Sequence, residues 1–145
     1  MKATIRWVDD AMFVGEAGSG HAVVVDGPPD AGGRNAGFRP MELVLTGVGA
    51  CTAFDVVAIL RKARQAVEDC RVELEAERAE TPPRVFTRIH IRFVVSGRNL
   101  KPAAVERAVN LSAEKYCSAT LMLRDAVDIT HSFEIVDAAA PASAD

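Results

Sequence analysis

The sequence has 145 residues, of which 49% are hydrophobic and 26% are charged, the balance expected of one soluble globular domain. Its net charge of −3 comes without a basic block, which argues against nucleic acid and against anionic membrane surfaces as partners. Three widely spaced cysteines fit neither a disulfide scaffold nor a zinc site of close Cys/His pairs, so we expect no metal and no cofactor.

Residues 1–38 predict a small antiparallel sheet followed by a loop. Alternating apolar residues indicate three short strands, Lys2–Val8, Met12–Glu16 and His21–Asp26, separated by turns rich in Asp and Gly. Residues 27–38 are rich in Gly and Pro, which is typical of a loop. A meander of this size is not stable alone, so we interpret the loop as a connection and not as a domain boundary.

The longest apolar segment, Arg39–Ala66, predicts a central helix that begins near Pro40. Between Leu43 and Leu60 the only charged residue is Asp55, so we expect this helix to be buried nearly all round. Its length approaches that of a membrane span, but glycines, threonines and Asp55 dilute the apolar run and favour a core helix. A domain of about 150 residues buries only about 70% of its unfolded surface, so we expect a second chain to help cover the helix.

The second half of the chain predicts a β-hairpin, a helix pair and a last strand. Asp69–Glu80 and Arg84–Ser96 alternate strictly, with glutamates on the outer face of one strand and arginines on that of the other, as in a paired hairpin. Helical spacing follows over Pro102–Tyr116 and Cys117–Arg124, and Val127–Val136 alternates as a strand.

The predicted order βββ-α-ββ-α-α-β is an α+β fold with helices backed on an antiparallel sheet. We expect residues 1–137 to form a single domain and the small-residue tail, 138–145, to be disordered. The N-terminus does not have the pattern of a signal peptide, so a reducing cytoplasm is the expected location.

Two of the three cysteines, Cys51 and Cys117, lie on predicted helices beside small residues that would let a substrate or a second sulfur approach. Cys70 shares the parity of Val72 and Leu74 on a strand and is assigned to the core. Free cysteines are among the most buried residue types, so the spacing alone favours packing over a functional pair.

The contexts of these two cysteines resemble those of the OsmC/Ohr family, the osmotically inducible and organic hydroperoxide resistance proteins. The resemblance lies in the run from Arg39–Leu43 through Gly49–Thr52 and, much later, in Lys115–Ser118. The order of strands and helices is similar over the whole chain short of the tail, and it resembles the OsmC-like branch more than Ohr proper.

The resemblance implies a thiol peroxidase that reduces organic hydroperoxides. Carried over by motif, Cys51 is the peroxidatic cysteine and Cys117 the resolving one, and the resulting disulfide is reduced by a dithiol, a lipoyl group in some members. The family also implies an intertwined homodimer with each site near the subunit interface, which agrees with the burial expected of the central helix.

The sequence departs from the family where the peroxidatic thiol is activated. The resemblance implies an arginine held by a glutamate, but Met41 occupies the position of that glutamate and Glu42 follows one place later. The arginine expected after the first strand is missing from Asp9–Gly15. A buried thiol without a nearby cation keeps a high pKa, so this departure bears directly on activity.

Arg34, Arg39 and Glu42 are the candidate substitutes. At about 1.5 Å of rise per residue, Arg39 begins roughly 18 Å from Cys51 along the helix, too far to reach it within one chain. Both arginines also fit ordinary solvated loop positions, and Glu42 fits a partner of the helix dipole. His131 shares the apolar face of the last strand, where a core histidine is the more usual role.

Two functions therefore stay open on the sequence. The first is reduction of organic hydroperoxides by Cys51 with Cys117 resolving. The second is a non-catalytic dimer, redox-sensing or binding small apolar ligands, that has lost the activating Arg/Glu pair.

Overall fold

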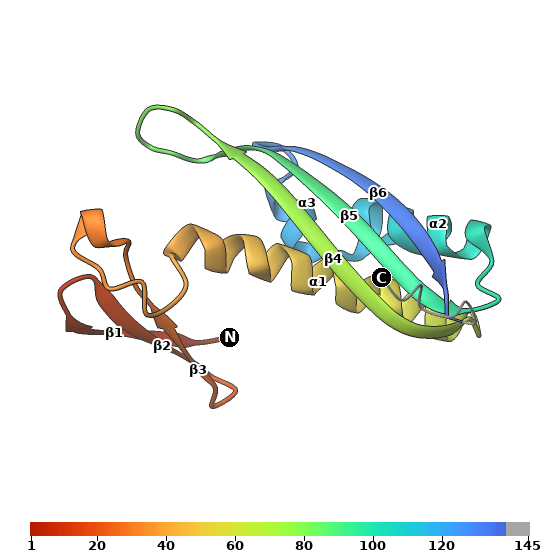
Figure 1. Cartoon of the computed structure of the whole chain (residues 1–145), viewed down its shortest axis with the longest axis horizontal. Coiled ribbons are helices and arrows are strands. Elements are labelled where there is room, and N and C mark those ends of the chain that lie inside the picture. The colour runs from red at the N-terminus through yellow and green to blue at the C-terminus, as the bar shows by residue number, and fades with distance from the viewer. Residues whose placement is uncertain (139–145) are drawn as a thin grey trace, which may run out of the picture. The chain divides into compact units, whose positions relative to one another are not determined.

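The computed structural model describes residues 1–138, and the chain divides into two compact units, Met1–Thr46 and Gly47 onward (Figure 1). Except for Ala138, the tail expected to be disordered lies outside the described residues. The prediction of a single domain over residues 1–137 stays a prediction.

The first unit contains the predicted meander. Strands β1 (Ala3–Asp9), β2 (Met12–Ala17) and β3 (Ala22–Val25) form an antiparallel sheet in the order β1-β2-β3, which confirms the three strands within a residue or two of their expected ends. Asp10 and Gly20 have positive φ angles, 42° and 86°, which allow the tight turns on either side of β2.

A buried carboxylate organises the loop that follows. Asp26 is 1% exposed and accepts hydrogen bonds from the backbone N–H groups of Gly27, Arg34 and Ala36 at 2.8, 3.0 and 3.0 Å. These donors, Ala36 first, hold the pKa of Asp26 below its usual value against the opposing effect of burial. The loop, which includes the short helix η1 (Pro29–Ala31), is therefore fixed by one side chain.

The central helix α1 spans Pro40–Lys62, shorter than the predicted Arg39–Ala66. At its start, the Arg39 backbone N–H donates to Glu42 Oε2 at 3.1 Å, so Glu42 caps the helix. Beyond its end, Arg64 takes a left-handed φ of 57°, and Ala66 already belongs to the next strand. The sequence did not predict this end of the helix, because the residue with the left-handed φ is an arginine and not the usual glycine.

The second unit is built on the sheet β4 (Ala66–Arg78), β5 (Phe86–Arg98) and β6 (Asp128–Asp137), in that order. β4 and β5 are antiparallel, which confirms the hairpin. β6 pairs with β5 in parallel, so the expectation of a wholly antiparallel sheet is wrong for this pair. The physical reason is the helical segment between β5 and β6, since this crossover carries the chain from the end of β5 back to the end of the sheet where β5 begins.

The hairpin also contains a bulge that the alternation did not predict. Glu77 pairs with Arg88, and the next residue, Arg78, pairs with Phe86, so Thr87 has no partner. The bulge brings Phe86 to the inner face, where it is 6% exposed, instead of leaving it among the arginines.

The crossover consists of α2 (Pro102–Leu111), one π-helical turn η2 (Ser112–Tyr116) and α3 (Ser118–Leu123). The predicted helix Pro102–Tyr116 is therefore helical over its length but widens in its last turn. Such wide turns are rare and often occur at functional sites.

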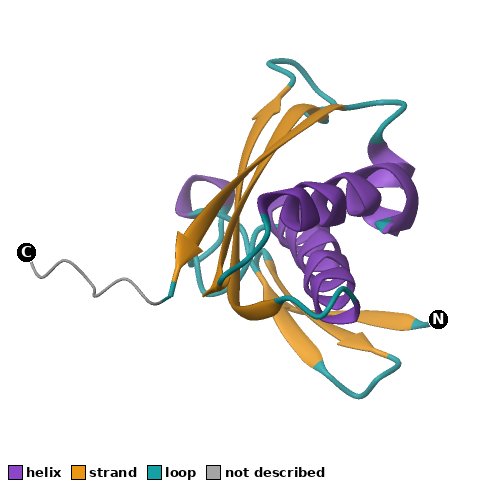
Figure 2. Cartoon of the chain, turned by 90° about the vertical axis from the view of Figure 1, so that its right-hand side faces the viewer, coloured by secondary structure: helices purple, strands orange, loops and turns teal. Residues whose placement is uncertain are grey.

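One face of the sheet carries the core, and α1 and α2 lie on that side of the three strands (Figure 2). Gly49 lets α1 approach β4, because a Cβ atom there would lie 2.6 Å from Leu74 Cδ1. The opposite face is polar: Arg92 forms ion pairs with Glu73 at 2.7 Å and with Glu134. This confirms the glutamate–arginine pairing expected across the hairpin.

Within the single chain, α1 is covered on one side. Its buried residues are Val48, Gly49, Thr52, Val56 and Leu60. Phe54 is 75% exposed, so the expectation of burial nearly all round is wrong for one chain alone. By length and composition α1 could also cross a membrane, a test that the core helix of a soluble protein passes as well.

Candidate functional site

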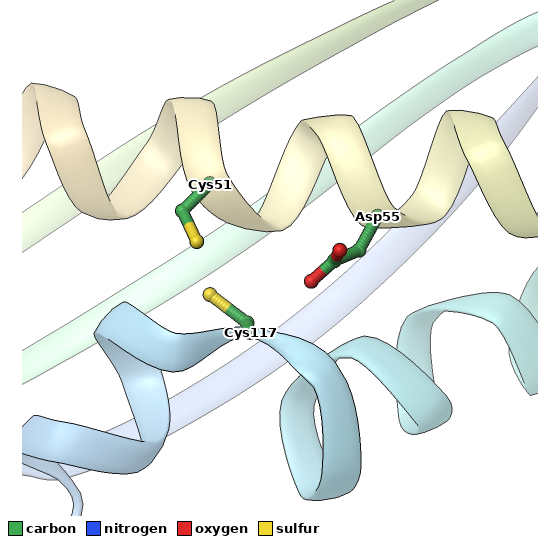
Figure 3. Close-up of side chains that lie close together, drawn as sticks. All are labelled: Cys51, Asp55 and Cys117. Carbon is green, nitrogen blue, oxygen red and sulfur yellow. The ribbon is translucent and has the colours of Figure 1, made fainter.

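Helix α1 presents Cys51 and Asp55 to the crossover. The two residues are four positions apart, one helical turn, so their side chains lie on the same side of the helix. Both are half-buried and lie next to the buried stripe that faces the sheet. Figure 3 shows both side chains directed toward Cys117.

The π turn and the start of α3 position Cys117. Its backbone N–H donates to Ser112 O at 2.9 Å, and its carbonyl accepts from the Leu121 N–H at 3.0 Å and from Thr120 Oγ1 at 3.1 Å. Its side chain is fully buried. The backbone at Cys117 is therefore held from both sides, which fixes where its sulfur can lie.

The two sulfurs that the sequence singled out meet in the fold (Figure 3). Cys51 Sγ, Cys117 Sγ and a carboxylate oxygen of Asp55 all lie within 4.8 Å of one another. Both cysteines are free thiols. A disulfide bond is about 2.05 Å long, so a shift of a few ångströms at most separates this arrangement from a covalent link.

Hydrogen bonds join the acidic side of the site to the crossover. The buried hydroxyls of Thr52 and Ser112 are 2.8 Å apart, and Ser112 Oγ also lies 3.4 Å from Asp55 Oδ2 and 3.4 Å from Thr52 O. Ser112 has one hydroxyl proton for these acceptors. The network ties α1 to η2 one turn from the sulfur pair.

Burial is the largest influence on the pKa of Cys117. It raises the pKa of the Cys117 thiol, against the hydrogen bonds with Thr120, and the neighbouring Cys51 raises this pKa further. Burial also raises the pKa of Cys70, assisted by Asp69. The neutral thiol is thus the resting form of Cys117, and Cys70, half-buried on β4, is not part of the pair.

The three predicted supporting residues, Arg34, Arg39 and Glu42, form ion pairs within the first unit. Arg34 pairs with Asp9 and Asp10, at 2.5 and 3.0 Å, and Arg39 pairs with Glu42 at 3.6 Å. The structure thus brings Arg39 and Glu42 together as an arginine–glutamate pair and joins Arg34 to a different set of carboxylates.

His131 does not hydrogen-bond a thiol. Its Nε2 lies 3.1 Å from Asn110 Oδ1, and its ring lines a cavity of about 80 Å³ that Thr52, Thr120 and Arg124 also line. The remaining lining residues of this cavity are Ile91, Phe93, Ala113 and Ile129.

Asp55 and Ser112 are site residues that the sequence did not predict. For Asp55 a signal existed, because it stands four residues after Cys51 in an otherwise uncharged helix. Ser112 reaches the site through the π turn, which no local pattern predicts.

Comparisons with known proteins agree with this architecture. The family model described as OsmC-like protein matches residues 32–132. Protein YhfA of Escherichia coli K12 is 54% identical over 141 residues, covering 95% of this chain and 100% of that protein.

Solved structures are similar over nearly the whole chain. A hypothetical protein from Aquifex aeolicus VF5 superposes with a TM-score of 0.82 at 31% identity, covering 94% of this chain and 96% of that one. The organic hydroperoxide resistance protein OhrB of Bacillus subtilis gives a TM-score of 0.61 at 20% identity, covering 92% and 96%, a likeness of fold alone.

Proposed function

We propose that this chain, which belongs to the OsmC-like protein family, is a thiol peroxidase that reduces organic hydroperoxides through Cys51 and Cys117. The observation that carries the proposal is the meeting of two free thiols from distant parts of the chain, with their sulfurs within 4.8 Å. Two thiols at this separation can alternate between the dithiol and the disulfide.

The exposure of the two thiols supports their roles. Cys51 is half-buried and Cys117 is fully buried, so a hydroperoxide reaches Cys51 first. Cys51 is therefore the peroxidatic cysteine, and Cys117, held behind it by its backbone hydrogen bonds, is the resolving one.

The proposed cycle passes from the dithiol through a sulfenic acid to the disulfide and back. The Cys51 thiolate attacks the distal oxygen of the hydroperoxide; the O–O bond breaks, an S–O bond forms, and the alkoxide takes a proton and leaves as the alcohol. The Cys117 thiolate then attacks the sulfur of this sulfenic acid, an S–S bond forms, the S–O bond breaks, and the hydroxide takes a proton from solvent and leaves as water. A dithiol, such as a lipoyl group, reduces the disulfide by exchange, a step that suits a reducing cytoplasm.

Activation of Cys51 requires positive charge, because the attacking species is the thiolate. The first unit contains one arginine–glutamate pair, Arg39 with Glu42. Because Arg39 begins roughly 18 Å from Cys51 along the helix, we propose that this pair activates only the Cys51 of a second chain.

We propose that the active form is a homodimer. A groove of about 510 Å³ on α1 is lined by Ala50, Ala53, Phe54, Val57, Ala58 and Arg61. In the first unit, Ile5 and Trp7 are 63% and 68% exposed. Apolar surface of this extent in both units favours a second copy of the chain as its cover.

The test treats reduced protein with one equivalent of cumene hydroperoxide and maps disulfides by mass spectrometry of non-reduced peptides. We expect a Cys51–Cys117 link, turnover when a dithiol is added, and a loss of at least about 1,000-fold in turnover for Cys51→Ser, which lacks a competent nucleophile. Cys70→Ser is the matched control and should turn over normally. Equal activity in Cys51→Ser, or a link that involves Cys70, would refute the assignment.

A non-catalytic redox sensor is the second candidate. It is favoured by the carboxylate of Asp55 beside the sulfurs and by the raised pKa of Cys117, both of which slow thiolate chemistry. A sensor forms the same disulfide, but on mixing with peroxide it does so slowly and without sustained turnover on dithiol. Stopped-flow rates therefore separate the two functions.

A further inference from the structure

We propose that the reduced site binds one Zn²⁺ ion through Cys51, Cys117 and Asp55, and that zinc and the disulfide exclude each other. The three side chains supply two sulfurs and one carboxylate oxygen from α1 and from the residue before α3, all within 4.8 Å of one another (Figure 3). The inference rests on this proximity and does not require peroxidase turnover.

The spacing is close to that of a zinc site. With Zn–S bonds of about 2.3 Å and Zn–O bonds of about 2.0–2.2 Å, two sulfurs on one tetrahedral zinc lie about 3.8 Å apart, and a sulfur and an oxygen about 3.5 Å. The limit of 4.8 Å exceeds these separations by roughly 1 Å. Small rotations of side chains are enough to close that gap while the helices stay in place.

The donor set selects the metal. Thiolates are soft ligands that favour zinc over magnesium or calcium, and a single carboxylate is a common third ligand for zinc. Three protein ligands leave the fourth position of the tetrahedron for water or a small ligand, as in catalytic zinc sites.

The surroundings of the ligands support binding. Ser112 Oγ, 3.4 Å from Asp55 Oδ2, can donate to this carboxylate and orient it, as outer hydrogen bonds do around bound metals. Cys117 is fully buried and Cys51 and Asp55 half-buried, so this is not an exposed acidic cluster. Two thiolates and a carboxylate bring three negative charges together, and a divalent cation compensates most of that charge.

Zinc binding and disulfide formation compete for the same sulfurs. Zn²⁺ replaces the two thiol protons, which are released to solvent. Oxidation of the pair by a hydroperoxide removes both thiolates as ligands, so Zn²⁺ leaves as the disulfide forms. The O–O bond breaks, and the hydroperoxide takes two protons from solvent to become alcohol and water. Conversely, a bound Zn²⁺ holds the Cys51 lone pair and slows its attack.

The experiment titrates reduced, metal-free, full-length protein with Co²⁺, which reports thiolate ligation by a charge-transfer band, and then with Zn²⁺. We expect one Co²⁺ per chain with a tetrahedral visible spectrum, and displacement of Co²⁺ by one equivalent of Zn²⁺. Cys51→Ser and Cys117→Ser should each reduce the charge-transfer band and weaken binding at least 100-fold. Asp55→Asn should weaken binding at least tenfold, because even loss of an outer hydrogen-bond partner of a ligand costs about 10–100-fold in metal affinity.

Cys70→Ser and Asp69→Asn are the matched controls, a thiol and a carboxylate on β4 outside the site, and should bind as the natural chain does. Circular dichroism of each variant reports whether it is folded, and Zn²⁺ protection of the natural chain against disulfide formation by peroxide is a readout that needs no variant. Absence of the band in the reduced natural chain, full binding by Asp55→Asn, or disulfide formation at an undiminished rate with saturating Zn²⁺ overturns the inference.

The two proposals fail separately. Metal-free protein that turns over peroxide but binds no Co²⁺ removes the zinc site and leaves the peroxidase. Protein that binds one Co²⁺ through both cysteines but does not turn over peroxide removes the peroxidase and supports the zinc site.

Discussion

The two sides of helix α1 have similar compositions and different surroundings. One side is buried against the sheet through residues such as Val56 and Leu60, both 0% exposed. The other side leaves Phe54 75% exposed beside an apolar groove. Cys51 and Asp55 lie at the border between the two, where a thiol is sheltered yet reachable.

This comparison separates two causes of apolar composition in one helix. The buried side stabilises the chain itself, and the open side stabilises nothing within a single chain. In the proposed dimer, a second chain covers the apolar residues of the open side, and Cys51 lies at the edge of that interface. The following predictions test each side in turn.

The largest effect is expected on the buried side. Leu60→Ala removes a fully buried side chain and leaves a cavity, which should lower the free energy of unfolding by about 2–5 kcal/mol. Lys62→Ala, an exposed residue of the same last turn, should change it by less than about 0.5 kcal/mol. Urea denaturation of both variants measures the difference, and equal losses would show that this side is not the core side.

On the open side, Phe54→Glu should weaken the proposed dimer without unfolding the chain. A charge at the centre of an apolar interface should raise the dimer dissociation constant at least about 100-fold, while the far-ultraviolet circular dichroism stays unchanged. Phe54→Leu keeps the apolar character and should stay close to the natural constant. Light scattering over a concentration series measures the dissociation constant. A natural chain that stays monomeric at every concentration would contradict the proposed dimer.

At the border, Thr52→Val tests the hydrogen bonds that tie α1 to the π turn. It removes the buried hydroxyl 2.8 Å from Ser112 Oγ at nearly constant volume, and we expect a loss of about 1–3 kcal/mol in the free energy of unfolding. Thr52→Ser retains the hydroxyl and should recover most of that loss. Thermal unfolding of the pair would contradict the network if serine and valine behaved alike.

The smallest expected effect is the pH dependence of the rate at which the disulfide forms. Because burial raises the pKa of Cys117, its thiolate fraction is low at neutral pH and increases with pH. The step that forms the disulfide after one equivalent of peroxide should therefore accelerate by up to about tenfold per pH unit until the pH passes that pKa. Quenched-flow mass spectrometry follows this step, and a rate that is flat from neutral to alkaline pH would exclude Cys117 as the attacking thiol.

The sequence predicted the helices and strands well, but it did not predict the β-bulge or the direction in which β6 pairs. Strict alternation predicted the β4–β5 hairpin and its arginine–glutamate pairs, because side-chain period follows directly from strand geometry. It could not predict the bulge at Thr87, which depends on how Phe86 packs. Nor could it give the parallel pairing of β6, since strand direction is decided by the path of the crossover.

For the candidate site, the sequence supplied the cysteine pair but not what surrounds it. The family resemblance of the two motifs singled out Cys51 and Cys117, and the fold brings them together. Ser112 meets Asp55 because the chain widens into a π turn, a local choice without a sequence signature of its own. The expectation of no metal site stays a prediction. It followed from wide cysteine spacing, whereas the proposed zinc ligands are brought together by tertiary packing.

The position of Cys117 in the crossover between β5 and β6 has a consequence during synthesis of the chain. A nascent chain that ends in the hairpin already carries Cys51, while Cys117 and the strand that closes the crossover are still to be translated. A sulfenic acid formed at that stage has no resolving sulfur and can advance to the irreversible sulfinic acid. Under the proposed function, Cys51 can therefore be oxidised reversibly only after the crossover that carries Cys117 has been translated.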